Sequence, residues 1–133
     1  MRIICKRLHR GDDLLASIRA IAQAEKIDAG VVLSGVGCIS RARVRDASGV
    51  NVRELNRHFE IVSLNGTVSQ TRCHLHIALS DESLATVGGH LLDGCIINTT
   101  CELIIGVLDG VRFDTEQDAQ TGYDEIIFRE INT

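Results

Sequence analysis

Residues 73–91, CHLHIALSDESLATVGGHL, contain three of the five histidines of the chain. His74 and His76 stand on alternate positions of an apolar run, and His90 follows the pair Gly88 and Gly89. Histidine is a common metal ligand, but it also occurs in strands without any chemical role. The spacing of the three histidines, and the elements that carry them, must therefore distinguish a metal site from incidental imidazoles.

The alternation of residues 73–80 is typical of a β-strand, in which successive side chains point to opposite faces. One face is wholly apolar and is the expected core side: Cys73, Leu75, Ile77 and Leu79. His74 and His76 project from the other face, with α-carbons about 6.5–7 Å apart at ~3.3 Å per residue. Two imidazoles at that separation can converge on one ion at metal–nitrogen distances of about 2.0–2.1 Å.

A third imidazole can join this pair. Gly88 and Gly89 allow either a sharp reversal or a close approach of the backbone, so that the chain can return and place His90 beside the other two. Three nitrogen ligands with an open fourth position describe a catalytic zinc site rather than a closed structural one. Cys73 is a poor fourth ligand because it points to the opposite face. The residues alone leave both a metal site and structural histidines open.

A second strand-like segment offers a candidate catalytic residue, Glu102. Residues 95–105 alternate between an apolar face and a face that carries Asn98, Thr100 and Glu102, and Thr99 falls on the apolar face. Glu102 could be a metal ligand, a general base on a metal-bound water, or a carboxylate that orients a ligating imidazole. The alternative is that Glu102 is a solvated strand residue.

Three arginines also stand on alternate positions, in the stretch SRARVR. On a strand, Arg41, Arg43 and Arg45 would share one face, as a solvated or edge-protecting surface or as a site for an anion, a partner or nucleic acid. The chain as a whole carries 14 basic and 18 acidic residues, for a formal net charge of −4. A phosphate backbone would therefore repel it.

The elements that must position these residues follow from periodicity. Residues 11–30 have the i, i+3, i+4 and i+7 apolar spacing of a helix, which Asp12 or Asp13 can cap and Gly30 would end. Most other segments have strand character, residues 82–89 read as a loop, and Asp93–Gly94 can form a turn. The pattern predicts an α+β fold, a single domain over residues 1–133. Its sheet is mostly antiparallel or mixed, with about seven strands, one main helix and at most a second short one.

Composition indicates a small soluble protein of the cytoplasm. The five cysteines are odd in number and form no C-x-x-C pair, which is the pattern of reduced, buried thiols. No stretch approaches the ~20 apolar residues of a membrane helix, and no signal peptide or lipid anchor is readable near the first residues. We therefore expect no membrane association.

Longer stretches carry a family resemblance. HFEIVSLNGTVS, HLHIALSDESLATVGGHLLDGCIINTTCELII and FDTEQDAQTGYDEI, together with the earlier GDDLLASIRAIAQAEKIDAGVVLSGVGCIS, resemble the plant and prokaryote conserved (PPC) domain in its stand-alone prokaryotic form. The resemblance implies an α+β fold, a homotrimer, and a metal, usually zinc or another divalent transition metal, near a subunit interface. By the H-L-H and G-G-H-L motifs, the implied ligands are His74, His76 and His90.

Two functional hypotheses follow. The first is a homotrimer whose three-histidine metal site has undetermined chemistry, hydrolase-like or lyase-like, with a small-molecule or anion ligand at the open position. The second is a non-enzymatic interaction module or a DNA-binding or regulatory protein. Plant relatives carry AT-hooks, R-G-R-P-type segments that enter the DNA minor groove, whereas this chain has no proline and no such segment. Nucleic acid is therefore not an expected partner.

Overall fold

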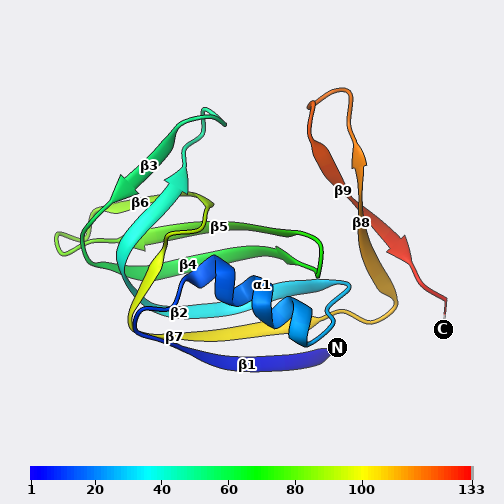
Figure 1. Cartoon of the computed structure of the whole chain (residues 1–133), viewed down its shortest axis with the longest axis horizontal. Coiled ribbons are helices and arrows are strands. Elements are labelled where there is room, and N and C mark those ends of the chain that lie inside the picture. The colour runs from blue at the N-terminus through cyan, green and yellow to red at the C-terminus, as the bar shows by residue number, and fades with distance from the viewer. Residues whose placement is uncertain (133) are drawn as a thin grey trace.

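Nine strands and one helix make up residues 1–132, which the computed structural model describes (Figure 1). In chain order they are β1 (Arg2–His9), α1 (Leu14–Ala24), β2 (Gly30–Arg45), β3 (Val52–Leu55), β4 (Phe59–Val68), β5 (Cys73–Ser80), β6 (Thr86–Leu91), β7 (Ile96–Val107), β8 (Val111–Gln117) and β9 (Asp124–Glu130). Thr133, the last residue of the predicted domain, lies outside the described residues. The α+β class and the mostly antiparallel sheet with one helix are confirmed.

One antiparallel sheet contains strands in the order β1-β7-β2-β4-β5-β6, and β3 pairs with β2. The 16-residue strand β2 pairs along its first part with β4 and β7, and at its end with β6, where Val44 faces Leu91 and Arg45 faces His90. Because β2 contacts both β4 and β6, the strands β2, β4, β5 and β6 close into a ring. This closure brings the end of β2 beside the histidine-bearing strands.

Helix α1 covers the core face of the sheet (Figure 1). It begins at Leu14 because the Asp13 carboxylate accepts a hydrogen bond from the Ala16 N–H at 3.0 Å. Four of its apolar residues are buried in the core: Leu14, Leu15, Ile18 and Ala22. The predicted end at Gly30 is wrong, since the helix stops at Ala24 and Lys26 takes a left-handed φ of 52°. Gly30 instead begins β2.

Two further expectations need correction. The segment predicted as a loop before His90 contains the start of β6, so that Gly88 and Gly89 lie within a strand. The main sheet has seven strands, as predicted, and the hairpin β8–β9 adds two more, while no second helix occurs in residues 1–132. Thr99 is exposed, with φ at 55°, because β2 and β7 shift register between Gly37 and Cys38. The predicted turn at Asp93–Gly94 does separate β6 from β7.

Strands β8 and β9 form a separate antiparallel hairpin. Figure 1 shows it standing off the end of the main sheet. The rings of Phe113 and Phe128 pack edge to face, with centroids 5.3 Å apart, and Phe113 is buried. The hairpin has its own small apolar contact, and the Phe113 N–H donates to the Asp28 carbonyl at 3.0 Å, which joins the hairpin to the segment before β2. Within the described residues, no helix has the length and apolar character needed to cross a membrane.

Candidate metal centre

His74 and His76 on β5 and His90 on β6 come together on one face of the sheet. One ring nitrogen from each histidine lies within 4.8 Å of the others. The ring centroids are separated by 5.1 Å for His74 and His76, 5.1 Å for His74 and His90, and 5.7 Å for His76 and His90. Nitrogen atoms spaced in this way can surround one ion at the usual ligand distance of about 2.0–2.1 Å after small rotations of the rings.

Strand register explains this convergence. His76 and His90 are direct cross-strand partners, and His90 is in turn the partner of Arg45 on β2. Partners in register point to the same face of a sheet, so these three side chains form a row across β5, β6 and β2. The predicted alternation of β5 is confirmed, because Leu75 and Ile77 are buried on the opposite face.

The glycine pair makes the closure of this row possible. A Cβ atom at Gly89 would lie 2.6 Å from the carbonyl oxygen of Arg45, so a larger residue would push β6 away from β2. Gly88 pairs with Ala78 and Gly89 with Ile77, which keeps β6 on β5 at the same time. Of the two roles expected for these glycines, the close backbone approach is present and the sharp reversal is not.

Burial and positive neighbours favour the neutral form of His74 and His90. Burial, followed by the charge of Arg45, lowers the pKa of His90 to about 4. The pKa of His74 is also lowered, first by burial and then by the charge of Arg72. Neutral imidazole is the form that binds a metal. Nδ1 of His90 is buried without a hydrogen-bond partner in the described residues, and metal ligation would use its lone pair. The three side chains thus fit a divalent transition metal.

A cleft of about 400 Å³ opens beside the histidines. The sheet contributes His74, His90 and Arg45 to its lining and the turn before β5 contributes Arg72, while His76 is exposed and does not line the cleft. The beginning of β9 supplies the facing wall: Tyr123, Asp124 and Glu125. The cleft is therefore bounded by residues from the main sheet and from the hairpin, and its size suits a small molecule.

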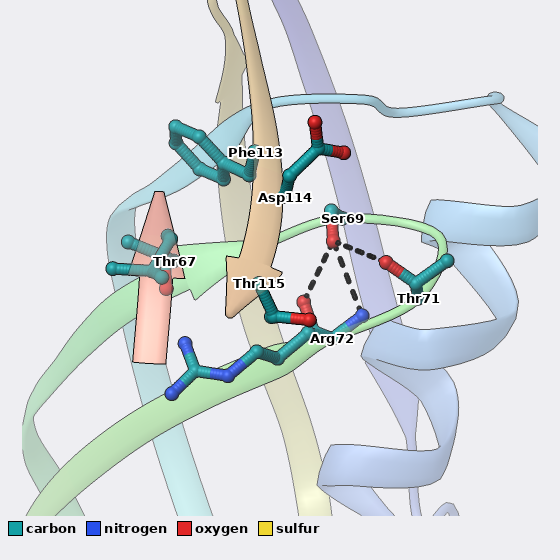
Figure 2. Close-up of a pocket in the computed structure, with 8 residues that line it drawn as sticks. Thr67, Ser69, Thr71, Arg72, Phe113, Asp114 and Thr115 are labelled. Atoms are coloured by element: carbon teal, nitrogen blue, oxygen red, sulfur yellow. Dashed lines mark hydrogen bonds between the residues drawn. The ribbon is translucent and has the colours of Figure 1, made fainter. Parts of the chain in front are cut away.

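The turn between β4 and β5 fixes Arg72 at the edge of this cleft. The buried hydroxyl of Ser69 accepts from the Arg72 N–H at 3.1 Å and donates to the Arg72 carbonyl at 3.1 Å. Figure 2 shows these two bonds and shows Thr115 of β8 near the Arg72 side chain, which extends away from the turn. Nη2 of Arg72 lies 3.5 Å from Nδ1 of His74.

Other residues singled out in the sequence lie elsewhere. Glu102 is exposed on β7, where its cross-strand partners are Arg7 and Val36, and the structure does not bring it to the histidine cluster. His9 and His58 are exposed, as their sequence context suggested.

The alternating arginines do share one face of β2, but they divide between two environments. Arg41 and Arg43 both form ion pairs with Glu54 at 3.4 Å, whereas Arg45 lines the cleft.

Sequence reasoning missed Arg72 and the hairpin residues. Arg72 has a detectable signal, because it precedes His74 by two positions and so continues the alternation of the histidine face. Tyr123, Asp124 and Glu125 have none, since their approach to the cleft depends on where an independent hairpin is seated.

The protein is a small α+β domain whose antiparallel sheet carries three histidines on adjacent strands. Comparison with known proteins shows the family to which it belongs. Residues 1–109 match the Plants and Prokaryotes Conserved (PCC) domain, so the chain belongs to this family. The bifunctional protein GlmU of Synechococcus sp. is 36% identical over 126 residues, which cover 95% of this chain and 20% of that protein. The chain thus spans about a fifth of the length of this curated relative.

Solved structures support the same fold. A hypothetical protein from Salmonella is 33% identical, with a TM-score of 0.94 over 97% of this chain and 94% of that one. A metal-containing protein from Archaeoglobus fulgidus is 27% identical, with a TM-score of 0.79 over 96% and 94% of the two chains. A candidate DNA-binding protein from Bacteroides thetaiotaomicron is 20% identical, with a TM-score of 0.85 over 95% and 91%, which bears on the fold alone.

Proposed function

We propose that this protein is a homotrimeric metal-binding domain in which His74, His76 and His90 hold zinc or another divalent transition metal. The observation that carries the proposal is the convergence of three ring nitrogens within 4.8 Å. The metal-containing relative from Archaeoglobus fulgidus supports it. Residues 1–133 act in this proposal as one unit, in which the sheet provides the ligands and the hairpin encloses the adjoining cleft.

The ligand set favours a reactive site over a structural one. Three protein ligands leave a coordination position open, and a metal bound in this way supplies Lewis-acid polarisation of an oxygen or a lowered pKa for a bound water. The three imidazoles would hold the ion, and the cleft would admit a small molecule beside it. We therefore assign the site hydrolase-like or lyase-like chemistry. Glu102 has no part in this assignment, because it lies outside the cleft.

Elemental analysis of the purified protein tests the metal site. We expect about one transition metal per chain, lost in the double variant His74→Ala/His76→Ala. The matched control is His9→Ala/His58→Ala, which removes two exposed histidines and should keep the metal. A metal-free preparation that refuses added zinc, or a double variant that retains it, would contradict the proposal.

The homotrimer is supported by apolar residues on the sheet face that α1 does not cover. Ile3, Leu33, Val36 and Val62 are 49%, 48%, 55% and 57% exposed on β1, β2 and β4. Apolar side chains gathered on one surface are typical of protein interfaces. Sedimentation equilibrium should show three chains per particle, Val36→Lys should shift the protein to smaller species, and Val50→Lys, at a valine that is 74% exposed in a turn, should not.

A non-enzymatic or regulatory role is the second candidate, and the candidate DNA-binding protein shares only the fold, which by itself assigns no role. The net charge of −4 and the ion pairs that hold Arg41 and Arg43 oppose binding to a phosphate backbone. Titration of labelled duplex DNA at increasing salt distinguishes the two. We expect the protein not to bind the duplex. An affinity for DNA that falls steeply with increasing salt would instead favour the regulatory role.

The cysteines support a reducing compartment, and we place the protein in the cytoplasm. All five cysteines are free, and Cys95 and Cys101 are buried, with burial raising the pKa of the Cys101 thiol to about 11. Cys5 is exposed, which departs from the expectation that these thiols are mostly buried.

A further inference from the structure

Two arginine side chains line the metal cleft without a carboxylate partner. Among residues 1–132, neither Arg45 nor Arg72 forms an ion pair within 4.0 Å, whereas Arg41 and Arg43 on the same face of β2 both pair with Glu54. In the part of the chain that the structure describes, the guanidinium of Arg72 forms one side-chain hydrogen bond, with Nδ1 of His74 at 3.5 Å. Nε of Arg45 is buried and has no hydrogen-bond partner among the same residues.

Unpaired guanidinium groups in a cleft favour an anionic ligand. A buried N–H without an acceptor is costly, and arginine offers donors in a planar fork that matches a carboxylate or phosphate group. The cost of leaving Arg45 unpaired disappears if a ligand brings the acceptor. Asp124 and Glu125 also line the cleft, but neither reaches a guanidinium.

The charge balance points the same way. A divalent cation beside Arg45 and Arg72 would bring four positive charges to one cleft, against two negative charges from Asp124 and Glu125 in its lining. Like charges in a poorly solvated site repel each other strongly. A bound oxyanion offsets this repulsion, and the guanidinium of Arg72 can turn from His74 toward it.

We propose that the metal cleft binds a small oxyanion-bearing molecule, a carboxylate or a phosphate, through the guanidinium groups of Arg45 and Arg72. The inference rests on the proposed function, because it names the ligand class of the same site. The oxyanion is held by the arginines, and the remainder of the molecule extends toward the open coordination position. The ~400 Å³ of the cleft limits the ligand to the size of a small metabolite.

Calorimetric titration of the zinc-loaded and metal-free proteins tests this. The probes are malonate, inorganic phosphate and uncharged malonamide, and the variants are Arg72→Gln and Arg45→Gln. Arg43→Gln is the control. Arg43 lies on the same face of β2 as Arg45, but its guanidinium already forms an ion pair with Glu54. We expect malonate or phosphate to bind and malonamide not to bind. Each cleft variant should weaken binding at least about tenfold, as for the loss of one hydrogen bond between charged groups. Arg43→Gln should bind like the native protein.

The outcomes separate this inference from the metal proposal. Stoichiometric zinc in Arg72→Gln with weakened anion binding supports both. Failure of zinc to bind, with arginine-dependent anion binding retained in the metal-free protein, overturns the metal site alone. Zinc binding with anion affinities equal in native protein and cleft variants overturns the role of the arginines, and so does equal binding of malonate and malonamide. The last comparison is made with the metal-free native protein, in which malonate has no zinc to coordinate, and therefore tests the inference even if a variant fails to fold.

Discussion

Replacement of Gly89 by alanine tests whether the closure of β6 on β2 builds the metal site. A Cβ atom at this position would lie 2.6 Å from the carbonyl oxygen of Arg45, and ordinary contacts begin at 3.4 Å. The two backbones must therefore separate by about 0.8 Å, the difference between these values. Because His90 follows Gly89 and is the cross-strand partner of Arg45, the displacement falls on one of the proposed metal ligands.

The magnitude follows from overpacking and from ligand geometry. Inserting a methyl group against fixed backbone costs roughly 1–3 kcal/mol of unfolding free energy. For a domain of this size, that corresponds to a fall in Tm of roughly 4–12 °C. Misplacing a ligand by nearly 1 Å should also weaken zinc binding, by roughly the 10–100-fold that loss of a supporting contact produces.

Gly106→Ala is a matched control with almost the same overlap. Its Cβ would lie 2.7 Å from Sδ of Met1, the end of a flexible side chain that can move away. Calorimetry of unfolding gives Tm, and competition with a chromophoric chelator gives zinc affinity. We expect Gly106→Ala to remain close to the native protein in both. If Gly89→Ala binds zinc with native affinity, or if both variants change equally, the argument that this close approach positions His90 is wrong.

Three further predictions concern separate features. The pKa of His90 is about 4 in the folded protein against 6.5 for the free group, so the unfolded state binds the proton more readily. The metal-free protein should therefore lose stability as pH falls from about 6.5 to about 4. Urea unfolding at several pH values measures this loss, and His90→Asn should make the unfolding free energy less dependent on pH. Asp13→Ala should lower the unfolding free energy by ~1 kcal/mol or more, through loss of the helix cap and of the hydrogen bond that Asp13 accepts from the Gly94 N–H at 2.7 Å, measured by urea unfolding, with exposed Glu116 changed to Ala as the control. Ser69→Ala should cost about 1–3 kcal/mol by unpairing the turn and, in the same calorimetric titration, should weaken anion binding if the turn positions Arg72.

The alternation of side chains along a strand accounts for most of what the sequence could predict about the site. His74 and His76 share a face because a strand has a period of two, and the same rule places Leu75 and Ile77 in the core. The helix face was also predictable, since Leu14, Ile18 and Ala22 recur at helical spacing and all are buried. These relations are local, and local geometry fixes them.

What the sequence could not predict depends on pairing between distant segments. The partner of His90 is Arg45, 45 residues earlier in the numbering, and only the closure of β2 on β6 makes them neighbours. Glu102 illustrates the reverse case, because its strand face is polar as predicted but lies beside β1 and β2 rather than beside β5. A polar strand face indicates either that the face is exposed to solvent or that it lines a functional site. Only the order of the strands in the sheet distinguishes these two cases.

The two walls of the cleft come from parts of the fold that are held in different ways. The histidines and both arginines lie on the main sheet or in the turn before β5, whereas Tyr123, Asp124 and Glu125 belong to the separate β8–β9 hairpin and the turn that joins its strands. A hairpin held to the sheet by few contacts can change sequence without disturbing the strand register that brings the imidazoles together. We therefore expect the proposed metal ligands and anion-binding arginines to depend on the sheet, and the choice among small anions to depend on the hairpin. Replacement of Tyr123 by another residue should therefore change which small anion binds in the cleft and leave the zinc content of the protein unchanged.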